Sequence, residues 1–349
     1  MVTFNSGEDS TAVLKNFTIT NSGGFNEGDY GGGIYVKSSK ATLESLIIEN
    51  NDVTGASYQG GGGGLCVIWS GKAYINNSVI RNTIGGGEVS ALYANHDGDI
   101  KATNCLIVNN KAHAVKMGTF YAGGAYNDVE LINCTVTNNL GPAILGASAS
   151  WGTVIITNSI IYNNLDGDGN NSSYSCNEDC LDYNKFTYSL VQGGHVGQGN
   201  IDANPKFVKV ITTGDEESDY HLADWSPAIG AGTATGAPTT DIEGNPRPNP
   251  AGSNPDMGAF ENKWGTPQNA PPVITAMSDV TVNEDESYSD TLRATDEEGD
   301  AITYSATSDT SAVTASITDS ILTLTPNANW NGVANIKAYA SDGISKDST

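Results

Sequence analysis

Basic residues are scarce in this sequence, whose 349 residues contain 16 Lys and Arg against 40 Asp and Glu, a formal net charge of −24. A nucleic-acid-binding protein needs a basic face, so this composition excludes that class of function. The sequence has no run of about 18 apolar residues, so we expect no insertion into a membrane. The N-terminal residues Met1–Phe4 lack the basic and apolar regions of a secretion signal.

Glycine is abundant instead, and its distribution argues against helices. Of the 41 Gly residues, 37 lie before Lys263. A coiled coil or a helical bundle does not tolerate this much Gly inside its elements. The class that remains is an acidic, β-rich, secreted protein. At about 150 residues per domain, the length predicts two domains.

A nine-residue phrase recurs along the first half of the chain. Its third position is Asn or Ser, at intervals of 29, 32, 27, 29 and 25 residues. A fixed period in this range predicts a solenoid, in which each repeat buries its face on its neighbours. β-Branched residues alternate on both sides of the third position, which predicts strands. The copies begin at Leu14, Leu43, Ile75, Ala102, Leu131 and Ile156, and a worn copy covers residues 186–194.

Three positions of the phrase have predicted structural roles. Because Asn tolerates the left-handed conformation, the third and eighth positions predict sharp turns, and stacked Asn side chains can bond to one another along the axis. The sixth position is expected to point inward. The third-position column is Asn16, Ser45, Asn77, Asn104, Asn133 and Asn158; the eighth is Asn21, Asn50, Asn82, Asn109, Asn138 and Asn163; the sixth is Ile19, Ile48, Ile80, Ile107, Val136 and Ile161.

A third strand follows each Gly-rich loop, and three strands per coil predict a parallel β-helix over residues 1–203. The pattern resembles the right-handed pectate-lyase-like helices, whose asparagine ladder lies at this turn. Residues 204–262 resemble the C-terminal signature of choice-of-anchor Q domain proteins, which are bacterial surface β-helix proteins. That signature is carried by Asn204-Pro-Lys-Phe207, Ser226-Pro-Ala-Ile-Gly-Ala-Gly232, Asp241-Ile-Glu-Gly-Asn-Pro-Arg247 and Asp256-Met-Gly-Ala-Phe-Glu261. We expect this segment to cap the open helix end, with Arg247 and Glu261 as a buried pair.

Residues 263–272 are rich in Pro and predict a linker. From residue 273 to 349 short alternating strands follow one another at intervals typical of a β-sandwich. Four phrases there resemble bacterial cadherin-like, Ig-like tandem repeats: Val282-Asn-Glu-Asp285, Ala294-Thr-Asp-Glu-Glu-Gly-Asp300, Pro326-Asn-Ala-Asn-Trp-Asn-Gly332 and Ala340-Ser-Asp-Gly343. Those repeats end with one further strand, so we expect a small antiparallel sandwich that lacks its last strand. The whole chain is therefore predicted to be all-β, and to be a fragment of a longer secreted protein.

The five cysteines fall into three groups. Cys176 and Cys180 lie in a polar loop, where a short-loop disulfide suits an exported protein and metal binding is the alternative. Cys105 and Cys134 share an inward column and are expected to be buried thiols of the core. Cys66 is expected to point outward as a partly covered surface thiol.

Calcium is the cofactor that the sequence favours. Asp166, Asp168 and Asn170 offer oxygen ligands at alternate positions, as calcium loops do, although Asn177 stands where such loops have Glu. The alternative is a solvated loop. The cadherin-like resemblance implies a second set of ligands, made up of Asp296, Asp300, Glu284 or Asp285, and Asn269 of the linker.

Catalytic groups of related lyases and hydrolases line the outer face of one sheet. The outward column after the Gly-rich loops is predicted to be Tyr35, Cys66, Tyr93, Lys116 and Leu145, with His96, Asp97, Asp99 and His113 close by in sequence. A lyase needs a base such as Lys116 and cations for its acidic substrate, which a charge of −24 repels. A hydrolase needs two carboxylates, which Asp97 and Asp99 could supply, although Asp-Gly-Asp is also a turn sequence.

Binding is the competing hypothesis, because exposed aromatic rings stack on sugars. The loops around the same face carry Trp69, Tyr93, Tyr121, Tyr126 and Trp151, although such rings also simply cover a helix flank. We therefore expect a secreted or cell-surface protein that acts in adhesion or glycan binding. Its partners would be a neutral polysaccharide, a surface glycan or neighbouring repeats of the same protein. The alternative is a polysaccharide lyase or glycoside hydrolase, so enzymatic activity stays undecided.

Overall fold

The structure is a computed structural model that describes residues 1–23, 32–53, 61–84, 90–111, 113–117, 127–145, 152–166, 169–175, 184–211 and 218–349. Every regular element in these ranges is a β-strand, so none of them holds a helix that could cross a membrane. The chain divides into two compact units, Met1–Pro267 and Gln268–Thr349. The division falls inside the segment that the sequence predicts as a linker.

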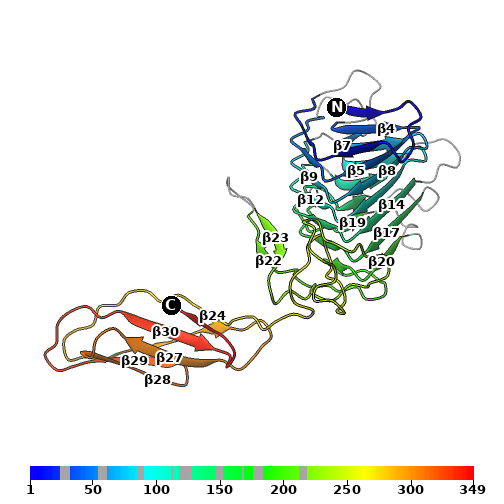
Figure 1. The fold of residues 1–349 in the computed structure, drawn as a ribbon. Coiled ribbons are helices and arrows are strands. Elements are labelled where there is room, and N and C mark those ends of the chain that lie inside the picture. The colour runs from blue at the N-terminus through cyan, green and yellow to red at the C-terminus, as the bar shows by residue number, and fades with distance from the viewer. Residues whose placement is uncertain are drawn as a thin grey trace. The chain divides into compact units, whose positions relative to one another are not determined.

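The first unit is a parallel β-helix whose coils pass through three seven-stranded sheets in turn. Figure 1 shows the coils stacked on one another. The first sheet contains β1 (Val2–Phe4), β4 (Ile34–Lys37), β7 (Gly62–Ile68), β10 (Ser90–Asn95), β13 (His113–Met117), β16 (Ile144–Leu145) and β19 (Tyr174–Ser175). The second contains β2 (Val13–Lys15), β5 (Lys40–Glu44), β8 (Lys72–Asn76), β11 (Asp99–Thr103), β14 (Asn127–Ile132), β17 (Gly152–Thr157) and β20 (Lys185–Thr187). The third contains β3 (Thr18–Thr20), β6 (Ile47–Glu49), β9 (Val79–Arg81), β12 (Leu106–Val108), β15 (Thr135–Thr137), β18 (Ile160–Tyr162) and β21 (Leu190–Val191).

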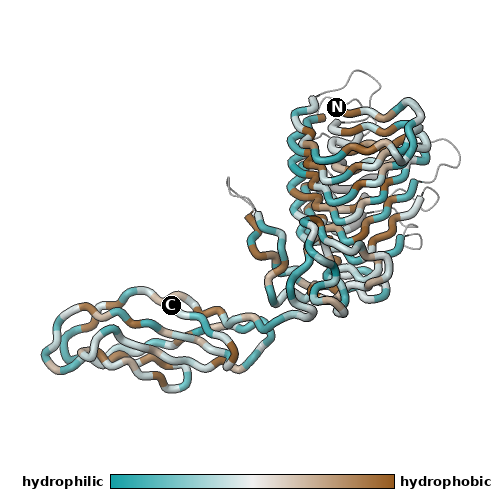
Figure 2. The backbone as a smooth tube through the Cα atoms, viewed as in Figure 1, coloured by the Kyte–Doolittle hydropathy of each residue, from teal (hydrophilic) through white to brown (hydrophobic). Residues whose placement is uncertain are grey.

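The core of the β-helix is built from columns of equivalent residues, which recur as apolar segments on successive coils in Figure 2. The sixth-position column is buried from Ile19 to Ile161, which confirms its predicted inward direction. A second inward column lies on the second sheet and consists of Leu14, Leu43, Ile75, Ala102, Leu131, Ile156 and Phe186.

Left-handed residues turn the chain between the sheets, as the repeat predicts. All members of the third- and eighth-position columns have a positive φ, between 49° and 62°. Side-chain bonds along the axis are also present in the third-position column. The Nδ2 of Asn104 donates to Oδ1 of Asn77 at 3.0 Å, and Nδ2 of Asn158 donates to Oδ1 of Asn133 at 3.2 Å.

A fully buried asparagine ladder occupies the ninth position of the phrase, which the sequence analysis did not single out. Asn110 and Asn139 are completely buried, and Asn164 is 1% exposed. Each amide bonds to the next coil: Nδ2 of Asn110 donates to Oδ1 of Asn139 at 2.9 Å, and Nδ2 of Asn139 donates to Oδ1 of Asn164 at 2.8 Å. A buried amide that donates and accepts in this way escapes the cost of an unsatisfied polar group.

Part of the glycine content follows from the close approach of successive coils. A Cβ at Gly64 would lie 2.7 Å from the backbone O of Ala91 and 2.8 Å from Cγ2 of Ile80. The oxygen of Ala91 belongs to the backbone and cannot move without shifting its coil. Glycine at this position therefore serves packing between coils rather than loop flexibility.

Residues 204–262 do not merely cap the open helix end, which corrects our expectation. This segment, which we call the closing segment, packs on the outer face of the third sheet and includes the hairpin of β22 (Phe207–Lys209) and β23 (Asp219–Leu222). Outward residues such as Leu106 and Ile160 are apolar, and Tyr220 and Met257 cover them. The helix end itself is closed by the ring of His195, which stacks on Phe186 with centroids 3.9 Å apart.

The turn asparagines of the third position hold the closing segment in place. Nδ2 of Asn104 donates to the backbone O of Thr240 at 2.7 Å, and Nδ2 of Asn133 donates to that of Asp256 at 3.0 Å. Nδ2 of Asn158 donates to the backbone O of Thr233 at 2.8 Å. The same column thus turns the chain and anchors the segment that covers it.

A buried ion pair fixes the closing segment internally, which confirms the predicted pair. Nε of Arg247 lies 2.9 Å from Oε2 of Glu261, and both side chains are completely buried. Asp241 and Asp256 are buried in the same cluster. Backbone N–H groups satisfy the carboxylates: Oδ1 of Asp256 accepts from Gly230 at 2.7 Å, and Oε1 of Glu261 accepts from Asn249 at 2.9 Å.

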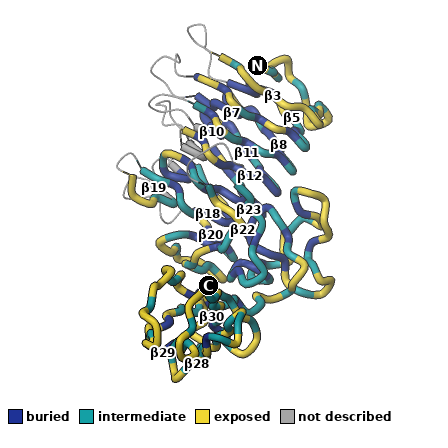
Figure 3. The backbone as a smooth tube through the Cα atoms, turned by 90° about the vertical axis from the view of Figure 1, so that its left-hand side faces the viewer, coloured by how far each residue is buried: buried dark blue, intermediate teal, exposed yellow. Residues whose placement is uncertain are grey.

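The second unit is a small antiparallel sandwich, as predicted, with less buried surface than the β-helix strands (Figure 3). One sheet contains β25 (Tyr288–Thr291), β29 (Ile321–Pro326) and β28 (Val313–Thr318); the other contains β27 (Thr303–Ser308), β30 (Ile336–Ser341) and β31 (Lys346–Ser348); β24 (Val273–Ile274) pairs with β26 (Ala294–Thr295). The expectation of a missing last strand is corrected, because β31 follows the Ser341-Asp342-Gly343 turn and pairs with β30.

The asparagine ladder should be a main source of stability. We expect Asn139→Ala to lower the free energy of unfolding by about 2–4 kcal/mol, because it strips partners from two buried amides. Asn76→Ala, which removes a half-buried amide from β8, is the matched control and should change it by less than about 0.5 kcal/mol. Urea unfolding measures both values, and equal effects would contradict a special role of the ladder.

The buried carboxylates should make stability depend on pH. Burial, with the neighbouring charge of Glu261, raises the pKa of Asp256 from 3.8 to about 7. The native state then keeps a proton that the unfolded chain has released, so the contribution of Asp256 to stability falls as the pH rises from about 4 to 7.

Asp256→Asn tests this prediction, because an amide does not titrate in that range. The difference in unfolding free energy between the parent protein and the variant should change by about 2–3 kcal/mol between pH 5 and pH 8. Urea unfolding at a series of pH values measures that difference. Parallel pH profiles would show that Asp256 does not titrate in this window.

Candidate functional site

Two of the predicted site residues meet at the turn between the first and second sheets. Trp69 follows β7 and His96 follows β10, one coil later, and their φ angles are 54° and 51°. The two rings stack with centroids 4.2 Å apart and an interplanar angle of 18°. Trp69 is 47% exposed, so the pair forms an aromatic surface open to solvent. We call this pair the Trp69–His96 platform.

Hydrogen bonds between successive coils hold the backbone of the platform in place. The backbone N of Ser70 donates to the backbone O of His96 at 2.9 Å. One coil earlier, Oγ of Ser38 donates to the backbone O of Trp69 at 2.9 Å, and Ser38 has a φ of 51°. Successive left-handed residues thus fix the two rings one above the other.

His96 and the two nearby carboxylates, Asp97 and Asp99, have different surroundings. Burial lowers the pKa of His96 despite the opposing effect of Asp97, which favours a neutral imidazole. Asp97 is exposed in the turn, whereas Asp99 begins β11 on the outer face of the second sheet. Asp99 forms an ion pair with Lys72, and its Oδ1 accepts from the backbone N of Asp128 at 3.1 Å. Asp99 therefore has a structural role on its own sheet.

The predicted outward column of the first sheet is in register, and those of its members whose side chains the structure describes are buried. Tyr35, Cys66, Tyr93, Lys116 and Leu145 are successive partners across the strands, as expected. The expected exposure is wrong, because Tyr93 is 1% exposed and Cys66 is completely buried. The hydroxyl of Tyr93 accepts from Nδ2 of Asn95 at 2.9 Å, so this ring offers no stacking surface. Burial also raises the pKa of Cys66 to about 12, which keeps it a thiol.

Several of the predicted site residues have side chains that lie outside the described part of the structure. His113 and Lys116 lie in β13, of which the structure describes the backbone. The residues Tyr121, Tyr126, Trp151, Asp168, Cys176 and Cys180 lie outside the described residues.

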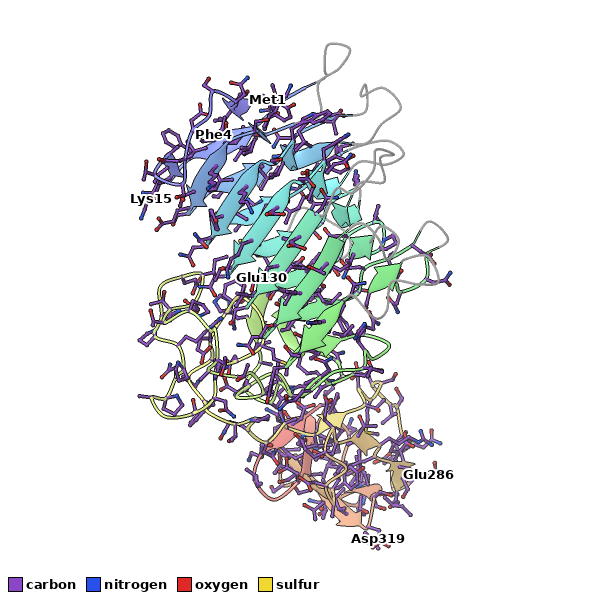
Figure 4. All side chains as sticks on the ribbon, turned by 90° about the vertical axis from the view of Figure 1, so that its right-hand side faces the viewer. Met1, Phe4, Lys15, Glu130, Glu286 and Asp319 are labelled. Carbon is purple, nitrogen blue, oxygen red and sulfur yellow. The ribbon has the colours of Figure 1, made fainter. Side chains whose placement is uncertain are left out.

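Ion pairs between successive coils cover the outer face of the second sheet. Nζ of Lys15 lies 2.6 Å from Oε1 of Glu44, and Nζ of Lys101 lies 2.7 Å from Oε2 of Glu130; Lys72 and Asp99 form a third pair. Lys15 and Glu130 are labelled in Figure 4. These pairs balance positive and negative charge locally, in contrast to the acidic chain as a whole. They depend on the register of strands, so the sequence analysis missed them.

A small pocket of about 200 Å³ lies beside β23 and also escaped the sequence analysis. Its lining includes His221, Asp224, Phe260 and Lys263. His221 lies between two carboxylates, 2.6 Å from Asp219 and 3.2 Å from Glu243. Burial opposes the charged form, but these two partners outweigh it and raise the pKa of His221.

Part of the predicted calcium set gathers at one end of the second unit. Oδ1 of Asp296 accepts from the backbone N of Asp300 at 3.0 Å, whereas its Oδ2 is buried without a partner among the described residues. Oε1 of Glu298 accepts from the backbone N of Ala270 at 3.2 Å. Asn269, the predicted linker ligand, therefore lies at the same end as Asp296.

Asp342 belongs to that end as well and was treated in the sequence only as part of a turn. Its Oδ2 accepts from Nδ2 of Asn269 at 2.8 Å. The donating backbone N–H of Ser345 is the main reason why the pKa of Asp342 lies well below its usual range. This end of the sandwich thus holds an ionised carboxylate next to Asn269.

Glu284 and Asp285 lie at the opposite end, which corrects the predicted ligand set. Oδ1 of Asp285 accepts from the backbone N of Asn329 at 2.8 Å, beyond the end of β29. A six-residue strand spans about 20 Å, so these side chains cannot share an ion with Asp296. Within the described ranges, no three His, Cys, Asp or Glu side chains form a group that could hold a metal ion.

Asp166 and Asn170 of the other predicted calcium loop are hydrogen-bonded to each other. Oδ1 of Asp166 accepts from the backbone N of Asn170 at 2.8 Å, and the backbone N of Asp166 donates to the backbone O of Asn170 at 2.8 Å. These bonds join Asp166 directly to Asn170. A calcium site at Asp166 and Asn170 stays a prediction.

Comparison with known proteins agrees with the two units. Residues 269–349 match the model of the bacterial Ig domain, and residues 3–193 match that of the right-handed β-helix region. No curated protein and no solved structure matches the chain. The resemblance to choice-of-anchor Q proteins is not among the matches and stays a prediction. Because the β-helix match covers more than half of the 349 residues, the chain belongs to the right-handed β-helix family.

Proposed function

We propose that this is a secreted or cell-surface protein that binds a neutral glycan on its β-helix and thereby serves adhesion. The Trp69–His96 platform is the observation that carries this proposal, because an exposed aromatic ring is the side chain that stacks on a sugar ring. The combination of a β-helix with a bacterial Ig domain suggests an extracellular-type protein. The choice-of-anchor Q resemblance supports display at a bacterial surface.

The surroundings of the platform suit an uncharged, hydroxyl-rich ligand. The ion pair of Lys72 and Asp99 lies on the adjoining second sheet. On the same sheet, half-buried Tyr74 is the strand partner of Thr42 on one side and of Lys101 on the other. Such groups can donate to and accept from sugar hydroxyls. The balanced ion pairs offer no excess of cations, and the net charge of −24 repels a polyanion. A neutral glycan is therefore favoured over a polyuronate.

Removal of the exposed ring should abolish most of the binding. We expect Trp69→Ala to weaken glycan binding at least tenfold, because loss of an aromatic stack costs about 1.5 kcal/mol. Trp264→Ala is the matched control, since Trp264 is 39% exposed on the same unit but lies outside the platform. A glycan array identifies the ligand, and titration calorimetry measures the affinities. Equal affinities of the two variants would contradict the platform as the binding site.

The enzymatic alternative is tested on the same samples. Release of reducing ends from the bound glycan, abolished by Asp97→Asn or Lys116→Ala, would replace the binding role with a catalytic one. Binding without release, retained in both variants, supports a binding protein.

We also propose that the bacterial Ig domain binds calcium at the end that holds Asn269. The supporting observation is the buried Oδ2 of Asp296, which has no hydrogen-bond partner among the described residues, since carboxylate and amide oxygens are the ligands that calcium prefers. Asp300 and Asp342 lie at the same end and supply further oxygens.

Thermal unfolding of the full chain tests calcium binding. Millimolar calcium should raise the unfolding temperature of the second unit by a few degrees in the parent protein. Asp296→Asn should remove this shift. Glu284→Gln, at the opposite end of the sandwich, should retain it. A melting curve unchanged by calcium in the parent protein would rule the site out.

A further inference from the structure

We propose that Cys105 and Cys134 are a modification site: they form a disulfide between two successive coils when the chain folds in the presence of a small-molecule disulfide. Both side chains are free thiols in this structure. Both are completely buried in the β-helix core, one coil apart. The inference does not depend on the proposed glycan binding.

The backbone places the two residues within bonding range. They are flanked on both sides by paired positions, since Thr103 pairs with Ile132 and Leu106 pairs with Thr135. The backbone N of Thr135 also donates to the backbone O of Cys105 at 2.9 Å. Neighbouring strands lie about 4.8 Å apart, which falls within the range of about 4.4–6.8 Å that disulfides require between Cα atoms.

A bond between the two sulfurs requires a rotation of one side chain and Cβ atoms within about 4.5 Å of each other. Sγ of Cys134 already leans towards the preceding coil, where it donates to the backbone O of Ala102 at 3.5 Å. The thiol of Cys105 leans the same way, towards the backbone O of Ile75, at 3.5 Å. The proposed bond therefore requires Cys105 to turn about its first side-chain bond, so that its sulfur leaves the preceding coil and approaches that of Cys134. The coils need not change their register.

The neighbours of the pair exclude other partners in the same column. Ser78 precedes Cys105 and Ser159 follows Cys134, and their hydroxyls occupy the positions equivalent to the two thiols. Cys66 is buried in a separate cluster with Tyr35 and Tyr93. Among the cysteines whose side chains the structure describes, Cys105 and Cys134 are thus each other's candidate partners for a disulfide.

The chemistry is a thiol–disulfide exchange. The thiolate of one cysteine attacks glutathione disulfide, a sulfur–sulfur bond forms to the protein, and one glutathione thiolate leaves. The second protein thiolate then displaces the remaining glutathione, so two thiols of the protein are oxidised and one glutathione disulfide is reduced to two thiols. The two protons end on the released glutathione.

Burial sets the time at which this reaction occurs. In the folded protein, burial and the neighbouring Cys134 hold the pKa of Cys105 well above its usual value, and neither sulfur is accessible. The exchange therefore takes place while the coils assemble. The bond would join adjacent repeats of a solenoid, whose stability rests on contacts between neighbours.

The test uses the full chain with Cys176→Ser and Cys180→Ser, which removes the two cysteines outside the described residues. The protein is unfolded, then refolded with reduced and oxidised glutathione, and its intact mass is measured. We expect a loss of two hydrogen atoms and a melting temperature raised by about 5 °C over the protein refolded in reductant.

Two further variants separate the proposal from general oxidation. Cys66→Ser should keep the mass loss and the raised melting temperature, whereas Cys105→Ser should lose both. Cys105→Ser continues the serine column of Ser78 and Ser159 and is therefore expected to fold. If a maleimide labels all three remaining thiols of the refolded protein in denaturant, or if the bond involves Cys66, the proposal is overturned.

Discussion

The register between successive coils is the constraint on which the β-helix depends. A buried Asn139 amide is acceptable only because Asn110 and Asn164 lie directly above and below it, with bonds of 2.9 and 2.8 Å. A slip by one residue would bury three amides without partners and turn the inward column outward. The same register stacks Trp69 on His96 and brings Lys101 to Glu130. Core, surface charge and candidate site therefore share one geometric cause.

The closing segment shows how the solenoid accommodates apolar residues on its outer face. Leu106 and Ile160 would lie in water on a bare third sheet, and the segment removes them from it. Burying Arg247 and Glu261 costs desolvation, which their direct contact and the surrounding backbone N–H groups offset. The turn asparagines also help to hold the segment, because a side chain already required for a left-handed turn bonds to it as well.

Periodicity explains what could be predicted from sequence. The repeat of about 28 residues is enough to assign turns to Asn104 and Asn133 and an inward direction to Ile107, all of which the structure confirms. Burial of Tyr93 was not predictable in this way, because it depends on what lies over a face rather than on which way the residue points. Ion pairs such as Lys72 with Asp99 needed the exact strand register, which the variable loop lengths between repeats conceal.

The arrangement of the loops in space also determines which of the predicted calcium ligands lie close together. Glu284 and Asp296 lie twelve positions apart in the sequence, yet their loops lie at opposite ends of the sandwich. Asn269 and Asp342 are far apart in the sequence but meet at one end of it. In a sandwich, residues whose loops lie at the same end are therefore better candidates for one ligand set than residues that are close in sequence. The same reasoning favours a glycan over a small ligand for the β-helix, because the Trp69–His96 platform and the ion pairs form an extended face. A polymer can contact several coils at once, and each coil adds its contribution to binding.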